Sequence, residues 1–419
     1  MATESPFSQA VDRTQSNSIK WQKYQGQDIL PMWIADSDFK VPDAITDALH
    51  RHVDHGVFGY GSAPAHLTQL LVDRMARLYQ WHIEPDWIVY LPGLVCGINL
   101  SVRATTQTNG GVLCPTPIYP PFKQAVKLGE RSYQPLPITL NDQRWLLALQ
   151  DDAVTPDSQL LLFCNPLNPG GTVYRRHELE AVCDFAEKHD LVVCSDEIHS
   201  DLILDPDCQH IPFASISEQA AQRSITLIAP SKTFNIAGLG ASMAIIPNPT
   251  LRRAFVKAKA GIVPDVNVLA YTAAEAAYEH GQVWLDEQLV LLRQHKQKLE
   301  ETINALPYLT LHPIEGTYLA WIDASELPVA SPFKFFEQAG VGVSPGADFG
   351  NPQFVRLNFA CHTDTLNEPY AALPRRYTHW PNNRHKRKHR KNSAFVLKKC
   401  LPVPIRYIRW HHAIRDSTR

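Results

Sequence analysis

The sequence lacks several features that would point to particular classes of protein. None of its eight cysteines stands in a CxxC pair, and several lie inside apolar runs such as LLLFC and LVVCS. We therefore expect reduced core cysteines rather than disulfides or a metal site. The N-terminal residues show no basic stretch followed by an apolar one, and no apolar run has the length of a membrane span. These absences predict a cytoplasmic protein that does not cross a membrane.

Acidic residues are almost missing from the last part of the chain. Residues 371–419 hold 14 of the 40 Lys and Arg but only one of the 42 Asp and Glu, so an acidic body is followed by a basic end. The cluster RHKRKHRK could be a nucleic-acid-binding arm or a solvated disordered tail. We favour a third interpretation, a changed reading frame that has replaced the native end. We accordingly expect residues 365–419 to be weakly packed or disordered, without specific affinity for nucleic acid.

The composition is otherwise that of a globular protein large enough for two domains, with 419 residues, 44% of them hydrophobic and 20% charged. Unbroken apolar runs, typical of strands buried on both faces, lie at 111–119, 159–166, 191–199 and 225–230. Helix-period segments such as 177–190 lie between them. This alternation predicts an α/β fold whose large domain has a mainly parallel sheet flanked by helices.

After about residue 280 the pattern changes to that of a smaller α+β domain. Residues 282–306 have the period of a long amphipathic helix, and 316–323 and 353–360 are strand-like. We therefore expect an N-terminal segment (1–44) that joins the small domain, a large domain (45–280), a small domain (281–364) and the atypical basic tail (365–419).

Polar and reactive side chains follow the four predicted strands. Ligands of doubly wound sheets bind outside the carboxyl ends of the strands, so these side chains are candidates for a site. They are Tyr119, Asn165, Asn168, Asp196, His199, Ser231 and Lys232. Each has an ordinary alternative when taken alone. The asparagines stand in the turn-forming NPLNPGG, Asp196 could cap a helix, Tyr119 and His199 could fill core, and Lys232 could be a surface lysine.

Together, these side chains match the needs of one cofactor, pyridoxal 5′-phosphate. Lys232 loses solvation at the end of a buried strand, which lowers its pKa and suits it to bond an aldehyde. Asp196 can keep the ring nitrogen of the cofactor protonated. Asn168 can donate to its phenolic oxygen, and Tyr119 can stack on its ring.

A phosphate site is predicted at LPGLVCGINL (91–100), where a Pro-Gly turn opens an apolar helix. The backbone N–H groups near Leu94, Val95 and Cys96 would be free to bind an anion at the helix N-terminus. Ser231 could add a hydroxyl group.

Six ordered motifs resemble the fold-type I pyridoxal-phosphate enzymes of the class I/II aminotransferase superfamily. They are LPMWIADSDF (30–39), VFGYGSAP (57–64), PTPIYPPF (115–122), NPLNPGG (165–171), SDEIHSDL (195–202) and SKTFNIAGL (231–239). Within this superfamily they are similar to the cystathionine β-lyase, or cysteine-S-conjugate β-lyase, branch. The resemblance covers roughly residues 15 to 362.

The resemblance implies further roles for individual residues. Tyr60 would reach the cofactor phosphate of a neighbouring subunit, which implies a homodimer. Arg356 would bind the substrate α-carboxylate with its planar guanidinium. The loop Trp33, Ile34, Ala35 and Asp36 would line the substrate pocket, and His199 stands where many aminotransferases carry a tyrosine.

One departure from the superfamily favours the lyase branch. Many aminotransferases have a phosphate-binding arginine eight residues after the lysine, but this chain has Gly240. We therefore expect a pyridoxal-phosphate-dependent carbon–sulfur β-lyase that cleaves L-cystathionine or related cysteine S-conjugates to a thiol, pyruvate and ammonia. The alternatives are an aminotransferase and a cofactor-binding regulatory protein with little turnover.

Overall fold

A computed structural model describes residues 5–368 and Leu373 of the chain. Internal contacts divide the chain into two units, Met1–Leu373 and Pro374–Arg419, and all described residues belong to the first. The predicted basic tail therefore lies outside the described residues, apart from 365–368 and Leu373. No helix in the described part is long and apolar enough to cross a membrane.

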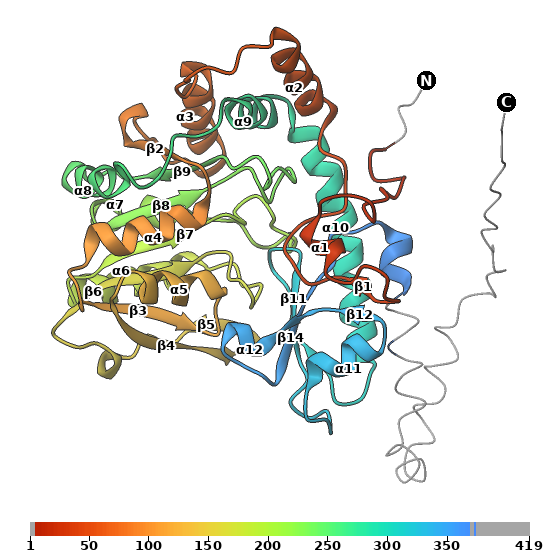
Figure 1. The fold of residues 1–419 in the computed structure, drawn as a ribbon. Coiled ribbons are helices and arrows are strands. Elements are labelled where there is room, and N and C mark those ends of the chain that lie inside the picture. The colour runs from red at the N-terminus through yellow and green to blue at the C-terminus, as the bar shows by residue number, and fades with distance from the viewer. Residues whose placement is uncertain (1–4, 369–372, 374–419) are drawn as a thin grey trace, which may run out of the picture. The chain divides into compact units, whose positions relative to one another are not determined.

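An eight-stranded sheet lies in the left-hand part of the described unit in Figure 1. Its strands are β2 (Ile88–Leu91), β3 (Gly111–Thr116), β4 (Ser132–Asn141), β5 (Arg144–Leu147), β6 (Ser158–Cys164), β7 (Val192–Asp196), β8 (Ser224–Ile228) and β9 (Ser242–Ile245). Their spatial order is β2-β9-β8-β7-β6-β3-β4-β5. Neighbours from β8 to β4 pair in parallel, whereas β9 and β5 run antiparallel to their neighbours. The four predicted strands correspond to β3, β6, β7 and β8.

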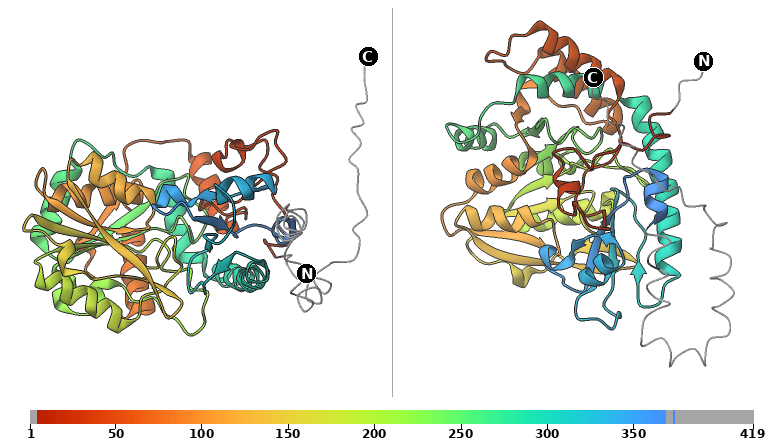
Figure 2. Two further views of the ribbon diagram at one scale, coloured as in Figure 1. Left: turned by 90° about the horizontal axis from the view of Figure 1, so that it is seen from below. Right: turned by 45° about the vertical axis from the view of Figure 1, so that its right-hand side comes forward.

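Helices cover both faces of this sheet (Figure 2), which explains why its central strands are apolar without interruption. The α-helices of this part are α2 (Asp43–His55), α3 (Ala65–Tyr79), α4 (Leu94–Thr105), α5 (Pro120–Leu128), α6 (Arg176–Lys188), α7 (Glu218–Gln222), α8 (Pro249–Lys259) and α9 (Val268–His280). Short 3₁₀ helices cover Pro85–Trp87, Asp151–Ala153 and Phe213–Ser215. Every residue of β8, the strand before Lys232, is buried.

A second sheet of four short strands lies beside the long helix α10 (Gln282–Asn304) (Figure 1). Its strands are β10 (Thr310–Leu311), β11 (Leu319–Asp323), β13 (Ser344–Pro345) and β14 (Phe354–Asn358), with α11 (Pro332–Gln338) and α12 (Gly346–Phe349) between them. The strand order is β10-β11-β14-β13, and all pairs are antiparallel.

The N-terminal residues pack onto this second sheet region. They form α1 (Ile19–Gln22) and β1 (Leu30–Pro31), and β1 pairs in parallel with β12 (Val341–Gly342). The Tyr24 hydroxyl also donates to the Glu337 carboxylate at 2.8 Å. As a result, the residues directly after β1 are held next to β14 and the loop after β8.

Arg144 connects the two sheets. Its Nε lies 2.6 Å from Oε1 of Glu315, which precedes β11, and its guanidinium also pairs with Glu178 on α6. The other Glu315 oxygen accepts the Val173 N–H at 2.9 Å, and the Gly316 N–H donates to the Gly171 carbonyl at 2.8 Å. These contacts fix the segment after β6, which carries Asn168, against the small sheet.

Replacing Arg144 with methionine should destabilise the protein by about 3 kcal/mol, because two largely buried carboxylates would lose their shared cation. The free energy of unfolding in denaturant measures this. The matched comparison is Lys188→Met, which removes a well-exposed partner of Asp151 and should cost less than about 1 kcal/mol. Equal losses in the two variants would contradict this account of the Arg144 contacts.

Candidate active site

The predicted site residues converge at the carboxyl ends of β6, β7 and β8. In the parallel register, Cys164 lies beside Asp196, and Asp196 lies beside Leu227. The chain therefore leaves these three strands at one edge of the sheet, so the residues that follow them are brought together. The same edge faces the backbone of residues 33–37, because the Lys232 amine donates a hydrogen bond to the Ala35 carbonyl.

Lys232 is the amine of the site. Burial lowers its pKa to about 8, while the carboxylates of Asp36 and Asp196 oppose this shift and the Arg356 guanidinium adds to it. Its side chain is partly exposed. An amine with a pKa near 8 is neutral in a useful fraction of molecules at neutral pH, so it can act as a nucleophile or a base.

Asp196 is a buried carboxyl group that no cation contacts among the described residues. It is 5% exposed and accepts the Ile198 N–H at 3.2 Å. Burial raises its pKa to about 7, and Lys232 lowers it only partly. Because an unpaired carboxylate is costly in this position, the site favours a ligand that presents a cationic N–H group to Asp196.

Arg356 is a buried cation on β14, where it is paired in register with Trp321 on β11 and Ser344 on β13. Its guanidinium donates to Asn168 Oδ1 at 3.0 Å and to the Trp33 carbonyl at 2.9 Å, and it lies 4.6 Å from the centre of the Phe349 ring. Burial lowers its pKa to about 10, so it stays charged at neutral pH. No ion pair of Arg356 is found within the described residues, so its charge is available to an anionic ligand.

The hydrogen bond from Arg356 also fixes the orientation of the Asn168 amide. An arginine can only donate, so the oxygen of Asn168 must face it and the NH₂ group must point elsewhere. Asn168 is therefore prepared to donate to a ligand acceptor. Asn165, by contrast, is structural, because its side chain accepts the Tyr174 N–H and donates to the Ile211 carbonyl.

His199 and Tyr119 complete the walls of the site. Burial, helped by the charges of Lys232 and Arg356, lowers the pKa of His199 to about 3, so the imidazole is neutral. Its Nδ1 is buried and has no partner in the described structure, and could therefore bind a ligand. Tyr119 directly precedes α5 and is partly buried, with a pKa raised by burial.

The first turn of α4 forms the predicted anion site. Gly93 precedes the helix without a side-chain cap. The Cys96 N–H donates to the Gly93 carbonyl at 3.2 Å, so the prediction that this N–H is free is wrong: the first helical turn already uses it. Leu94 is buried and Val95 is exposed. Ser231, on the neighbouring loop, is 8% exposed.

Gly240 packs directly against the turn before α4. Its φ is +75°, and a Cβ at this position would lie 2.6 Å from the Pro92 carbonyl oxygen. A larger residue would therefore be strained in its backbone and would also clash. This close approach gives a physical reason for the glycine that the sequence has at position 240.

Tyr60 is the one predicted site residue that the single chain leaves fully exposed to solvent. It lies in the irregular segment between α2 and α3. The intrachain structure therefore gives it no role at the site described above.

The structure adds residues that the sequence patterns did not single out. Asn358 donates to the carbonyls of Ile34 and Asp36 at 2.6 and 2.9 Å. It lies two residues after Arg356 on β14, so the period of a strand could have placed both side chains on one face. Arg13 and Lys20 also bind this loop, but no local pattern marks either of them.

The protein family that this sequence matches is consistent with the geometry of the site. Residues 30–372 match the family described as aminotransferase class I and II, and the chain belongs to this family. The cystathionine β-lyase PatB of Bacillus subtilis (strain 168) is 34% identical over 376 residues, which cover 86% of this chain and 97% of PatB.

Two solved structures show the same fold. The crystal structure of OvoB is 53% identical, with a TM-score of 0.88, and the match covers 89% of this chain and 99% of OvoB. Cystalysin of Treponema denticola, solved with a pyridoxal 5′-phosphate cofactor, is 32% identical with a TM-score of 0.83, covering 89% of this chain and 98% of cystalysin. The predicted fold class is thereby confirmed.

The raised pKa of Asp196 makes a prediction about stability in the cofactor-free protein. Between the ordinary value of 3.8 and about 7, the unfolded chain has released this proton while the folded chain keeps it. The free energy of unfolding therefore falls as the pH rises through this range, and Asp196 accounts for up to about 4 kcal/mol of this loss.

Asp196→Asn should not lose stability in this way, because asparagine does not titrate. The free energy of unfolding of the variant minus that of the wild type should therefore increase from pH 4 to pH 7. Denaturant unfolding of both cofactor-free proteins across this range measures it. A difference that does not change with pH would show that the folded-state pKa of Asp196 is ordinary.

Proposed function

We propose that this chain is a pyridoxal-phosphate-dependent carbon–sulfur β-lyase that cleaves L-cystathionine or related cysteine S-conjugates. The observation that carries the proposal is the convergence of Lys232, Asp196 and Arg356, an amine, an acid and a cation. Each is desolvated, and in the part of the chain that the structure describes none has a counter-charge in contact. The family and the names of PatB and cystalysin support the same reaction class and cofactor.

The side chains fit pyridoxal 5′-phosphate. Lys232 would bond its aldehyde, Asp196 would pair with its ring nitrogen, and the Asn168 amide and neutral His199 would bind its phenolic oxygen. Tyr119 would stack on the ring. The N–H groups at Leu94 and Val95, with the Ser231 hydroxyl, would hold the phosphate at the uncapped end of α4, and the Cys96 N–H would join them only by giving up its bond to the Gly93 carbonyl.

The cofactor, when bound, supplies an electron-withdrawing cationic ring to the substrate's α-carbon. Arg356 binds the α-carboxylate and thereby orients the Cα–H bond toward Lys232. Lys232, freed by the substrate amine, removes that proton as a base, and the β-thiolate leaves. With uptake of one water, the three-carbon fragment ends as pyruvate and ammonia. Trp33, Ile34 and Ala35 would line the side of the pocket next to Arg356.

The purified protein incubated with L-cystathionine should release pyruvate and a thiol without any added keto acid. Lys232→Ala should lower this turnover by roughly 10³-fold or more, because both the base and the attachment point are removed. The same variant should lose the visible absorbance of lysine-bound cofactor. Turnover that strictly requires a keto acid would instead identify an aminotransferase.

We also propose that the protein is a homodimer. The segment before α3 exposes Val57, Phe58 and Tyr60, and Ile262 is exposed on the nearby loop after α8. Apolar side chains gathered in this way are typical of a protein interface. Tyr60 would then reach the cofactor phosphate of the second subunit. We further propose that the protein is cytoplasmic and that its N-terminal segment, large domain and small domain cover residues 1–44, 45–280 and 281–364.

The shared-site arrangement can be tested by complementation between two inactive variants, Tyr60→Ala and Lys232→Ala. If Tyr60 serves the partner's site, mixed dimers contain one site with both native residues. Co-refolding equal amounts should then restore roughly a quarter of wild-type activity, since half of the dimers are mixed and each has one intact site. No recovery, when native mass spectrometry detects mixed dimers, would place Tyr60 outside the neighbouring site.

A further inference from the structure

The loop that faces Lys232 is held by side chains rather than by regular secondary structure. Five consecutive carbonyls, those of residues 33–37, each accept a hydrogen bond from a side chain. Two of the donors are the site residues Arg356 and Lys232. The other donors, Asn358, Lys20 and Arg13, lie outside the proposed contacts with cofactor and substrate, so they serve the loop itself.

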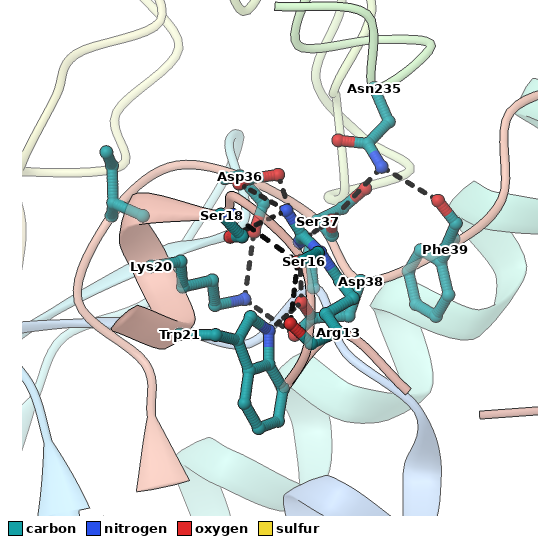
Figure 3. A network of polar contacts seen from close by, with 12 residues as sticks. Arg13, Ser16, Ser18, Lys20, Trp21, Asp36, Ser37, Asp38, Phe39 and Asn235 are labelled. Atoms are coloured by element: carbon teal, nitrogen blue, oxygen red, sulfur yellow. Dashed lines mark hydrogen bonds and ion pairs between the residues drawn. The ribbon is translucent and has the colours of Figure 1, made fainter. Parts of the chain in front are cut away.

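A four-charge network fixes the far end of this loop (Figure 3). Arg13 forms two hydrogen bonds with the Asp36 carboxylate, at 2.9 and 3.3 Å, and one with Asp38 at 2.7 Å. The Lys20 amine, which is 1% exposed, lies 2.6 Å from Asp38 and donates to the Asp36 carbonyl at 2.9 Å. The Trp21 N–H donates to Asp38 at 3.0 Å.

The network ties the loop to two distant parts of the chain. Arg13 and α1, with Lys20 and Trp21, come from the N-terminal segment, whereas Asn235, three residues after Lys232, donates to the Ser37 and Phe39 carbonyls at 3.0 and 2.7 Å. Figure 3 shows Asn235 approaching the loop from the side opposite Lys20. The Lys232 loop and the 33–38 loop therefore cannot shift independently.

We propose that Arg13 and Lys20 are positioning residues of the active site, which act through Asp36 to hold the 33–38 loop and to set the proton affinity of Lys232. Lys20 neutralises Asp38 and anchors the backbone of Asp36. Arg13 then shares its charge between the two carboxylates. The charge that Asp36 presents to Lys232 is thereby reduced but not cancelled.

The charged groups around Lys232 make this effect specific. They are Asp36 on the loop, Asp196 at the end of β7 and Arg356 on β14. The nearby imidazole of His199 is neutral. Among these charges Asp36 has the largest effect on the pKa of Lys232, and it raises that pKa. Of the carboxylates that face Lys232, Asp36 has an arginine partner, whereas no arginine among the described residues contacts Asp196. Removing the charge of Asp36 and removing the charge of Arg13 should therefore change the electrostatic potential at Lys232 in opposite directions.

The test uses the protein with pyridoxal 5′-phosphate bound and follows the pH midpoint at which the visible absorbance of the lysine-bound cofactor changes. Asp36→Asn should lower this midpoint by about one pH unit, because a negative charge is lost. Arg13→Met should raise it by about half a unit, because Asp36 is left without its partner. A general loss of folded structure in the two variants would not shift the pH midpoint in opposite directions.

Arg252→Met is the matched control, since Arg252 on α8 pairs with Asp86 through a side chain of similar exposure, 16% against 20% for Arg13, and its partners Asp86, Ile246 and Pro247 lie outside the site. It should leave the midpoint unchanged. In the double variant Arg13→Met/Asp36→Asn, the midpoint should equal that of Asp36→Asn, because Arg13 has lost the group through which it acts. Hydrogen exchange of the peptide that contains residues 33–38 should speed up in Lys20→Met but not in Arg252→Met.

Shifts of the same sign in Asp36→Asn and Arg13→Met, or a shift in Arg252→Met as large as either, would overturn the proposal. If Arg13→Met does not bind cofactor, the isosteric variant Asp36→Asn is the deciding test. An unchanged pH midpoint in Asp36→Asn would be sufficient to reject the proposal. The inference rests on the proposed cofactor but not on the lyase reaction. A protein that shows the opposite shifts yet forms no pyruvate would refute the proposed function and leave this inference standing.

Discussion

The site depends on charges that the fold desolvates without pairing them directly. Asp196, Lys232 and Arg356 each lose solvation, and burial is the largest influence on the pKa of all three. A protein interior tolerates such groups only when the surrounding structure is stable enough to hold them. The extensive apolar core around β3, β6, β7 and β8 provides that stability. A ligand that brings the missing counter-charges to these groups is bound more tightly for the same reason.

The second requirement is that a loop without regular structure stays in one place. Residues 33–37 present backbone carbonyls to Lys232 and Arg356, so a displaced loop would disturb the amine and the guanidinium together. Buried ion pairs and side-chain amides hold this loop where a sheet ladder cannot. In the proposal made above, the N-terminal segment therefore supports the active site, although its described residues contribute no strand to the large sheet.

The large-sheet part of the site could be read from the sequence because its residues follow strands directly. Unbroken apolar runs located β6, β7 and β8, and the rule that ligands bind at strand ends then selected Asn168, Asp196 and Lys232. The distinction between Asn165 and Asn168 could not be read in this way. Both stand in the same turn motif, and only the approach of Arg356 from β14 shows which amide is left to donate.

Apolar periodicity and local motifs are enough to predict the fold class, the cofactor chemistry and the order of the site residues. The pKa of each group and the partners of Arg13, Lys20 and Asp38 follow only from the three-dimensional arrangement. Desolvation and ion pairing depend on distances between segments far apart in the chain. Arg13 has no local signal that distinguishes it from a surface arginine, and its role becomes visible only when the fold places it between Asp36 and Asp38.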